Sequence, residues 1–294
     1  MFLAPMAKIS GGELAAEVSN AGGFGVIGAG YGDLNWLDQQ VELARGARVG
    51  IGLITWNMAP GALEAALKHQ PAALWLSFGD PCPHIAPIHE AGAIAICQVG
   101  TVNEAIAASE AGADVIVAQG SEAGGHGRPG RALFGLLPAI SAAVPGTPLV
   151  AAGGINNQAG LNAAGALGAA GVALGTAFYA SVEALDVAAA KQRIVDSRGD
   201  DTLHSRVYDH VRGPLWPEGY TGRTIRTRLT DEWAGRENEL AEVIGPIRTQ
   251  HQAAMKQADM SVRALFAGEG IDAIDSVQSA REITERFDIV MGAH

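Results

Sequence analysis

A repeated alternation of helix-like segments and short apolar runs through residues 1–180 is the feature that most constrains the fold of this chain. Four alanine–glycine steps punctuate the alternation: Ala21-Gly22-Gly23, Ala91-Gly92-Ala93, Ala111-Gly112-Ala113 and Ala170-Gly171. Glycine just past the end of a helix is the usual left-handed cap, so each step predicts a helix that ends and a strand that follows. Such alternation is typical of α/β proteins with a parallel sheet.

Eight strands are predicted, and each is short and apolar on both faces, as expected of parallel strands covered by helices. They lie at 2–6, 23–27, 49–54, 73–78, 93–99, 115–119, 149–152 and 171–174. Eight such units are consistent with either a (β/α)₈ TIM barrel or a doubly wound sheet. A typical barrel takes ~250 residues, and the abundance of alanine and glycine makes a more compact one reasonable here.

Charge divides the chain into two parts. Residues 1–180 carry 18 charged side chains, whereas residues 181–294 carry 33, so the first part buries more of its surface. We predict a barrel over residues 1–185, a mainly helical subdomain over 186–267 that covers the active face, and a C-terminal helix within 268–294 that returns to the barrel. In the second part, helices are expected at 183–196, 231–243, 246–267 and 279–291, with irregular chain at 206–230.

Composition excludes several classes of partner. A net charge of −11 argues against binding to a nucleic-acid backbone or to an anionic membrane surface. No apolar stretch reaches the ~18 residues that indicate a membrane span. The only cysteines, Cys82 and Cys97, give no basis for a disulfide framework and fit a reducing compartment. We therefore expect a cytoplasmic protein with no nucleic-acid and no membrane partner.

The strand predicted at 115–119 runs into a loop, residues 120–127, that holds four glycines around His126. Glycine is favoured where a backbone turns sharply or approaches something closely, and histidine exchanges protons near neutral pH. We therefore predict that His126 handles a proton beside a closely packed ligand; donation to a backbone carbonyl is the structural alternative. Glu122 is interpreted as a carboxylate that braces the loop. The histidines in polar surroundings are predicted to lie at the surface: His69, His204, His210, His251 and His294.

The seventh and eighth predicted strands end at Gly153-Gly154 and at Gly175-Thr176. In TIM barrels the loops after these two strands frequently bind phosphate. Backbone N–H groups at these positions, with a helix start near Asn156, suit a dianion, and the Thr176 hydroxyl offers one more hydrogen bond. A tight turn without a ligand is the alternative reading of the paired glycines.

Two other clusters give weaker signals. A dinucleotide fingerprint starting at Gly28 would need glycine at position 33, where Asp33 stands, so no Rossmann site is predicted. Cys82, His84 and His89 are too sparse for regular ligand spacing, and no metal site is predicted.

Five segments resemble the nitronate monooxygenase family, formerly called 2-nitropropane dioxygenase, in their order and spacing. They are residues 4–6 (Ala-Pro-Met), 18–25 (Val-Ser-Asn-Ala-Gly-Gly-Phe-Gly), 120–126 (Gly-Ser-Glu-Ala-Gly-Gly-His), 151–155 (Ala-Ala-Gly-Gly-Ile) and 174–178 (Leu-Gly-Thr-Ala-Phe). Together they span most of residues 1–180, and the Glu-Ala-Gly-Gly-His run is specific to this family and its close relatives.

The resemblance implies a TIM barrel that binds FMN noncovalently and a set of residues around it. The implied phosphate site consists of Gly153, Gly154, Gly175 and Thr176. The implied flavin lining consists of Met6, Gln98, Gln119, Gly124 and Gly125, with His126 as the catalytic base. The chain departs from the family at the third strand: many members carry Val-Asn-Leu there, with the asparagine near the flavin, and this chain has Gly50-Ile51-Gly52-Leu53-Ile54. That departure bears on the substrate more than on the cofactor.

The implied reaction is FMN-dependent oxidation of small alkyl nitronates or nitroalkanes by O₂ to a carbonyl compound and nitrite. His126 would remove the proton α to the nitro group of a neutral substrate, and FMN would supply the redox chemistry. The same scaffold serves NAD(P)H-dependent quinone reductases and a flavin-dependent enoyl-ACP reductase, so an NAD(P)H-dependent flavin reductase is the alternative. A flavin- or phosphate-binding protein without catalysis is a third reading. A homodimer is compatible with each of them.

Overall fold

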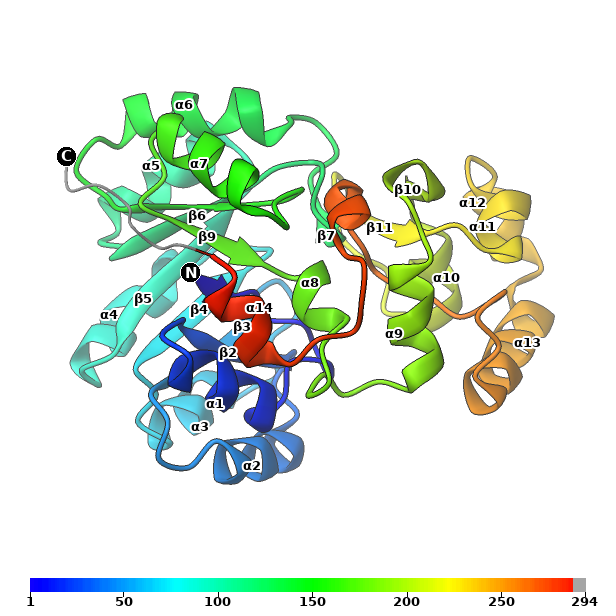
Figure 1. Cartoon of the computed structure of the whole chain (residues 1–294), viewed down its shortest axis with the longest axis horizontal. Helices are drawn as coiled ribbons and strands as arrows, with labels where there is room; N and C mark the ends of the chain where they lie inside the picture. The colour runs from blue at the N-terminus through cyan, green and yellow to red at the C-terminus, as the bar shows by residue number, and fades with distance from the viewer. Residues whose placement is uncertain (288–294) are drawn as a thin grey trace.

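The computed structural model describes residues 1–287, which form a closed barrel with an appended region, residues 188–266, to one side (Figure 1). Eight parallel strands pair in the order β1-β9-β8-β6-β5-β4-β3-β2. The Leu3 N–H donates to the carbonyl oxygen of Phe24 at 2.9 Å, beside a bridge between Phe2 and Phe24, so β1 also joins the start of β2. A doubly wound sheet would leave both edges open. The predicted TIM barrel is therefore confirmed.

The eight predicted strands are all present, with small shifts at their ends. They are β1 (Phe2–Leu3), β2 (Gly25–Gly30), β3 (Val49–Ile54), β4 (Ala73–Ser77), β5 (Ile94–Val99), β6 (Val115–Gln119), β8 (Leu149–Ala152) and β9 (Gly171–Leu174). The helices that cover them are α1 (Gly12–Asn20), α2 (Leu34–Leu43), α3 (Ala62–Lys68), α4 (Cys82–Glu90), α5 (Val102–Glu110), α6 (Leu133–Ala143), α7 (Gln158–Ala166) and α8 (Thr176–Tyr179).

Local sequence signals set many of these boundaries. Helices α4 and α5 each end one residue before an alanine–glycine step, and Gly92 and Gly112 take φ values of +77° and +98°, which favour glycine. Helix α5 begins with a capping box: the Thr101 hydroxyl accepts from the Glu104 N–H at 3.2 Å, and the Glu104 carboxylate accepts from the Thr101 N–H at 3.1 Å.

Two apolar layers hold the barrel together. A small cluster that includes Val26, Trp75, Ile96, Val117 and Val150 fills the barrel interior, and a much larger one lies between the strands and the outer helices. Because alternate side chains of a strand point to opposite faces, strands apolar on both faces serve both layers at once.

The appended region is more mixed than predicted. Its helices are α9 (Ala188–Val195), α10 (Val207–Arg212), α11 (Arg228–Trp233), α12 (Glu237–Glu242) and α13 (Ile244–Gln257), with a 3₁₀ turn η1 (Gly199–Asp201). It also holds β10 (Thr202–Ser205) and β11 (Thr221–Ile225), which form an antiparallel sheet with β7 (Gly125–Gly127) in the order β10-β11-β7. The histidine loop therefore contributes the strand that joins the barrel to this region.

Several expectations for the appended region were wrong in detail. The segment 206–230, expected to be irregular, contains α10 and β11, because β11 is stabilised by pairing with β7, which is remote in sequence. The helix expected at 231–243 is interrupted at Gly235, which has φ of +82°, and the helix expected at 246–267 ends at Gln257. Helix α9 starts only at Ala188.

The chain then returns to the barrel through a segment, residues 267–287, that carries the 3₁₀ turn η2 (Glu269–Ala273) and α14 (Ala280–Glu285). Helix α14 packs against α1, and the two lie side by side in Figure 1. The part of the helix expected at 279–291 that follows residue 287 lies outside the described residues, as does His294. Among the residues that the structure describes, no helix combines the length and apolarity needed to span a membrane.

Candidate active site

One large cavity, of about 470 Å³, lies at the carboxyl ends of the barrel strands and is bordered by the appended region. TIM-barrel enzymes place their active sites at this end of the barrel. All the residues predicted for the site line it: Met6, Gln98, Gln119, Gly124, Gly125, His126, Gly153, Gly154, Gly175 and Thr176. The structure thus brings the predicted residues together in one space.

The first end of this cavity, which we call the glycine end, is formed by the loops after β8 and β9. Gly153 and Gly154 have φ values of +118° and +69°, so the turn requires glycine. The backbone N–H groups of Gly153, Gly154, Gly175 and Thr176 form no hydrogen bond within residues 1–287. Unpaired N–H groups that line one cavity make a binding site for an anion.

The return segment supports the glycine end from behind. The Asn156 side chain donates to the carbonyl oxygen of Gly270 at 2.8 Å, and the Gly268 N–H donates to the Thr176 hydroxyl oxygen at 3.0 Å. A Cβ atom at Gly270 would lie only 2.1 Å from the carbonyl oxygen of Gly154, so the two backbones touch. The Thr176 hydroxyl, predicted as a donor to a ligand, is thus already an acceptor and keeps its own proton for donation.

Two glutamines line the middle of the cavity. The Gln98 side-chain oxygen accepts from the indole N–H of Trp75 at 3.2 Å and from the Ser77 hydroxyl at 3.4 Å, which leaves the Gln98 amide protons for a ligand. The Gln119 amide donates to the carbonyl oxygen of His126 at 3.0 Å. Gln119 therefore both faces the cavity and positions the strand that carries the histidine.

The second end of the cavity, which we call the histidine end, is built around a His126–Asp209 pair. Nε2 of His126 lies 2.7 Å from Oδ1 of Asp209, and the two side chains are 14% and 3% exposed. A neutral imidazole bonded in this way donates from Nε2 and keeps its lone pair on Nδ1. The structural alternative predicted for His126, donation to a backbone carbonyl, is replaced by a contact with a buried carboxylate.

Aromatic rings enclose the histidine end. The Trp216 indole stacks on the His126 imidazole with the ring centroids 3.6 Å apart and the planes 5° from parallel, and Phe266 approaches the same imidazole to 5.4 Å. On the barrel side, Tyr31 is close enough to Asp209 for the two groups to interact electrostatically: burial, and then the Asp209 charge, raise the pKa of Tyr31 to about 12. Tyr31 is therefore a neutral phenol at physiological pH.

Comparison with known proteins shows the family to which this chain belongs. A family model described as nitronate monooxygenase matches residues 54–288. The chain belongs to the nitronate monooxygenase family. Nitronate monooxygenase npaC of Metarhizium robertsii is 36% identical over 87% of this chain and 79% of its own length. The nitronate monooxygenase of Neurospora crassa is 32% identical over 97% of this chain and 86% of its own length.

Two solved structures have the same overall fold as this member of the family. FabK from Thermotoga maritima superposes with a TM-score of 0.85 at 28% identity and covers 97% of this chain and 90% of its own. The nitroalkane oxidase from Streptomyces ansochromogenes superposes with a TM-score of 0.83 at 27% identity and covers 97% of this chain and 93% of its own. The resemblance inferred from the five sequence segments is confirmed.

Membership of the nitronate monooxygenase family makes the protein a flavin-dependent oxidoreductase with a small-molecule substrate. Its third strand departs from the pattern of many members, as the sequence indicates: Gly52, Leu53 and Ile54 line the cavity and offer it no polar side chain. A Cβ atom at Gly52 would lie 2.3 Å from the Pro5 Cβ atom, so glycine is required there by the close approach of the first strand's loop.

Sequence reasoning missed several residues that line this cavity. Asp209 is 83 residues from His126, within a segment expected to be irregular, so no local spacing points to it. Trp216 lies between glycine and proline residues in the same segment, and no local pattern marks it as a site residue. Glu122 does brace the loop, because its carboxylate accepts from the Leu133 N–H at 2.8 Å.

The surface prediction was wrong for two histidines of the appended region. His251 is buried, and burial, with the charges of Arg212 and Arg263, lowers its pKa to about 4. His204 is half-buried with Nε2 2.8 Å from the carbonyl oxygen of Ser121, and burial lowers its pKa. Within residues 1–287, His, Cys, Asp and Glu side chains form no group of three able to hold a metal ion.

A buried ion pair fixes the appended region to the barrel beside the cavity. The Arg263 guanidinium pairs with the Asp186 carboxylate, and the Tyr179 hydroxyl donates to that carboxylate at 2.6 Å. Asp186 is 2% exposed and Arg263 is 12% exposed. Because Tyr179 and Asp186 follow the last barrel strand and Arg263 belongs to the appended region, this contact positions the side chains at the histidine end.

Proposed function

We propose that the protein oxidises small alkyl nitronates, and the nitroalkanes from which they form, with O₂ and noncovalently bound FMN. The products are a carbonyl compound and nitrite. The observation that carries this proposal is the pairing of two features in one cavity: an anion site of unpaired N–H groups at the glycine end, and a buried His126–Asp209 pair at the histidine end.

The residues present fit FMN. Gly153, Gly154, Gly175 and Thr176 would hold its phosphate through backbone N–H groups, and a phosphate is the part of FMN that such a site recognises. Met6, Gln98, Gln119, Gly124 and Gly125 would line the rest of the flavin, with the Gln98 amide protons free to donate to it. When bound, FMN supplies an acceptor for electrons taken from the nitronate.

The chain's own residues handle the proton and position the substrate. His126 accepts the proton α to the nitro group at Nδ1, because Nε2 is committed to Asp209. The buried Asp209 carboxylate keeps the imidazole in this orientation and stabilises the imidazolium that forms. The stacked Trp216 prevents the ring from rotating and excludes water from one of its faces. A preformed nitronate has already lost this proton and needs no base.

The balance of the reaction is simple. Two nitronate ions and one O₂ give two carbonyl compounds and two nitrite ions, so both oxygen atoms of O₂ are used. Each nitronate carbon gains one oxygen atom and becomes a carbonyl carbon, while its carbon–nitrogen bond breaks and nitrite leaves. An NAD(P)H-dependent flavin reductase acting on quinones or enoyl thioesters stays the alternative prediction. It needs NAD(P)H as the electron donor and yields no nitrite.

One spectroscopic experiment separates the two. In the absence of oxygen, one sample of FMN-loaded protein is mixed with NADH or NADPH, and a separate sample is mixed with ethyl nitronate. Nitrite is measured in both samples after air is admitted. We expect ethyl nitronate, and not NAD(P)H, to bleach the flavin, and nitrite to form under air. Rapid bleaching by NAD(P)H with no nitrite from the nitronate would replace this proposal by the reductase. Free FMN at the same concentration is the control.

A further inference from the structure

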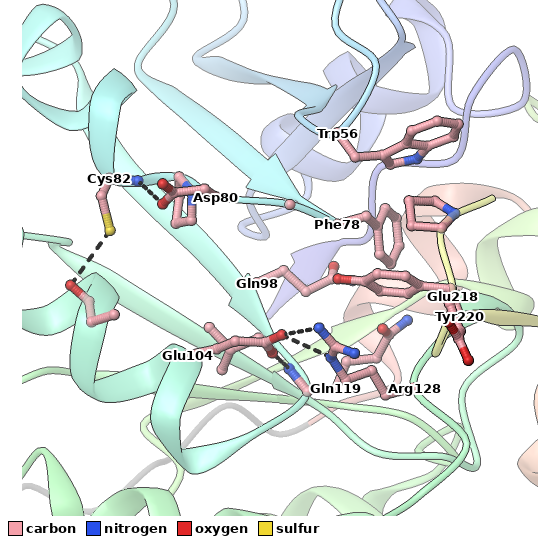
Figure 2. Close-up of a pocket in the computed structure, with 16 residues that line it drawn as sticks. Trp56, Phe78, Asp80, Cys82, Gln98, Glu104, Gln119, Arg128, Glu218 and Tyr220 are labelled. Atoms are coloured by element: carbon pink, nitrogen blue, oxygen red, sulfur yellow. Dashed lines mark hydrogen bonds and ion pairs between the residues drawn. The ribbon is translucent and has the colours of Figure 1, made fainter.

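A second cavity of about 410 Å³ adjoins the first at the carboxyl ends of β4, β5 and β6 (Figure 2). Phe78, Gln98 and Gln119 line both cavities, so the two cavities meet at these side chains, which include the glutamines predicted to line the flavin. Nothing in the proposed reaction of a small nitronate uses this second space.

The walls of the second cavity are largely apolar. Figure 2 shows the rings of Trp56, Phe78 and Tyr220 along one side, with Asp80 and Cys82 on the opposite side and Gln98 between them. The rings are held by mutual contacts: Phe78 and Tyr220 lie 6.0 Å apart at 89°, an edge-to-face arrangement. Flat aromatic walls of this kind bind alkyl chains and aryl rings through buried apolar area.

The only cation that lines this cavity among the described residues, Arg128, is already paired with a carboxylate. Nε of Arg128 lies 2.7 Å from Oε1 of Glu104, and the guanidinium lies 4.6 Å from the centre of the Tyr220 ring. The Asp80 carboxylate accepts from the Cys82 N–H at 3.0 Å. With Glu218 also at the rim, the carboxylates outnumber the single, paired arginine. Such a site disfavours anionic groups, including the pyrophosphate of a nicotinamide dinucleotide, and accepts an uncharged group.

We propose that this second cavity binds an uncharged alkyl or aryl substituent of the nitronate while its reacting carbon lies beside His126. This inference rests on the proposed function and specifies its substrate class. Nitronates with a long apolar chain or an aryl group are then better substrates than the smallest ones, because their substituent leaves water for the aromatic walls.

The kinetic test uses a series of primary alkyl nitronates from ethyl to octyl, together with 2-phenylethyl nitronate. KM should fall by about fourfold for each added methylene until the cavity is filled. Ala107, an exposed residue of α5, lines the second cavity, so Ala107→Trp should remove this dependence on chain length. Asn103→Trp, at an exposed position of the same helix that does not line the cavity, is the matched control and should retain it.

A second measurement needs no turnover. Cys82 lines the cavity and is partly exposed, whereas Cys97 is fully buried. Burial raises the pKa of both thiols, that of Cys97 to about 12, so methyl methanethiosulfonate should modify Cys82 much faster than Cys97. In the FMN-loaded protein, 2-phenylethanol should slow the modification of Cys82 severalfold, and ethanol at the same concentration should not. Cys82→Ala shows whether any other group reacts.

The outcomes separate this inference from the proposed function. Protection of Cys82 by 2-phenylethanol together with falling KM values supports both. Turnover of nitronates with a KM independent of chain length, and no protection, overturns the second-cavity inference and leaves the proposed function standing. Protection without any nitrite from any nitronate supports apolar binding in the cavity and overturns the proposed function. Protection by NADH and none by 2-phenylethanol overturns the assignment of an uncharged ligand.

Discussion

The two ends of the active-site cavity are built in different ways. The glycine end is formed by backbone atoms. Its unpaired N–H groups come from two loops that directly follow adjacent barrel strands. The histidine end is formed by side chains from distant parts of the chain. They are His126 from the loop after β6, Asp209 and Trp216 from the appended region, and Tyr31 from the loop after β2.

Under the proposed function, this difference separates the end of the cavity that holds the cofactor phosphate from the end that removes the substrate proton. A backbone turn depends on local φ and ψ angles and survives changes in the region that covers it. The histidine end exists only while the appended region is docked, because Asp209 and Trp216 both come from it. Perturbing the appended region should therefore remove catalysis before it removes flavin binding.

The largest expected effect comes from His126→Asn, which removes the base but retains a polar side chain. Turnover of neutral nitroalkanes should fall by about 10²- to 10⁴-fold, the usual contribution of a general base. Turnover of preformed nitronates should fall far less, because no proton remains to be removed. Steady-state kcat/KM for nitroethane and for ethyl nitronate measures both; equal losses with the two substrates would contradict the role of His126 as base.

Asp186→Asn tests whether the docking of the appended region controls the histidine end. This substitution leaves Arg263 as a buried cation without its ionic partner, and the cost of breaking such a pair is about 3–5 kcal/mol. Urea denaturation should show this loss of stability, and nitroalkane turnover should fall at urea concentrations where flavin is still bound. Arg226→Gln, which breaks an exposed ion pair with Asp231, is the control and should cost less than about 1 kcal/mol. Simultaneous loss of flavin and activity would contradict the proposed independence of the two ends.

Acid should loosen the appended region through His251. Its pKa is about 4 in the folded protein and ~6.5 when unfolded, so above pH 6.5 it is neutral in both states. Between pH 6.5 and 4 only the unfolded chain binds the proton, so the free energy of unfolding falls as the pH falls, by at most about 3 kcal/mol. His251→Leu should flatten this dependence in denaturation curves at pH 7 and pH 4.5, whereas His89→Gln, at an exposed position of α4, should not. An unchanged acid dependence in His251→Leu would exclude this cause.

Asp209→Asn should weaken the base without removing it. A hydrogen bond to a charged group contributes about 1.5–3 kcal/mol, which corresponds to a loss of about 10- to 100-fold in nitroalkane kcat/KM. Flavin affinity should stay unchanged, because Asp209 belongs to the histidine end alone. The ratio of nitroalkane to nitronate turnover is the measurement, and an unchanged ratio would show that Asp209 does not act through His126.

Gly154→Ala should give the smallest effect and act at the opposite end. An alanine at a φ of +69° costs about 1–2 kcal/mol, so FMN should bind roughly 5- to 30-fold more weakly if the turn distorts. Riboflavin, which lacks the phosphate, should bind equally well to the wild type and the variant. Fluorescence titration of the apoprotein with both flavins gives the comparison; weakened riboflavin binding would place the effect away from the phosphate.

The barrel and the positive-φ turn at Gly153 and Gly154 could be predicted from the amino-acid sequence because both depend on local signals. The alanine–glycine steps mark helix ends, and paired glycines at 153 and 154 mark a turn with positive φ, whatever lies elsewhere in the chain. His126 was found for the same reason, since its glycine loop is contiguous.

The partners of His126 could not be found in this way. Asp209 and Trp216 precede β11 in the chain, and β11 pairs with β7, the strand that contains His126, across about a hundred positions. The segment that carries β11 contains glycine and proline, which locally favour irregular chain, and long-range hydrogen bonds override that preference. His251 shows the same limit: its polar neighbours in sequence gave no sign that tertiary packing buries it.

The most direct measurement is a crystal structure of the FMN-loaded protein. The phosphate should accept hydrogen bonds from the N–H groups of Gly153, Gly154, Gly175 and Thr176, and the isoalloxazine ring should lie along Gln98 and Gln119 within reach of His126. A phosphate bound anywhere else, or a His126 imidazole turned away from the flavin ring, would contradict the assignment of the two ends of this cavity.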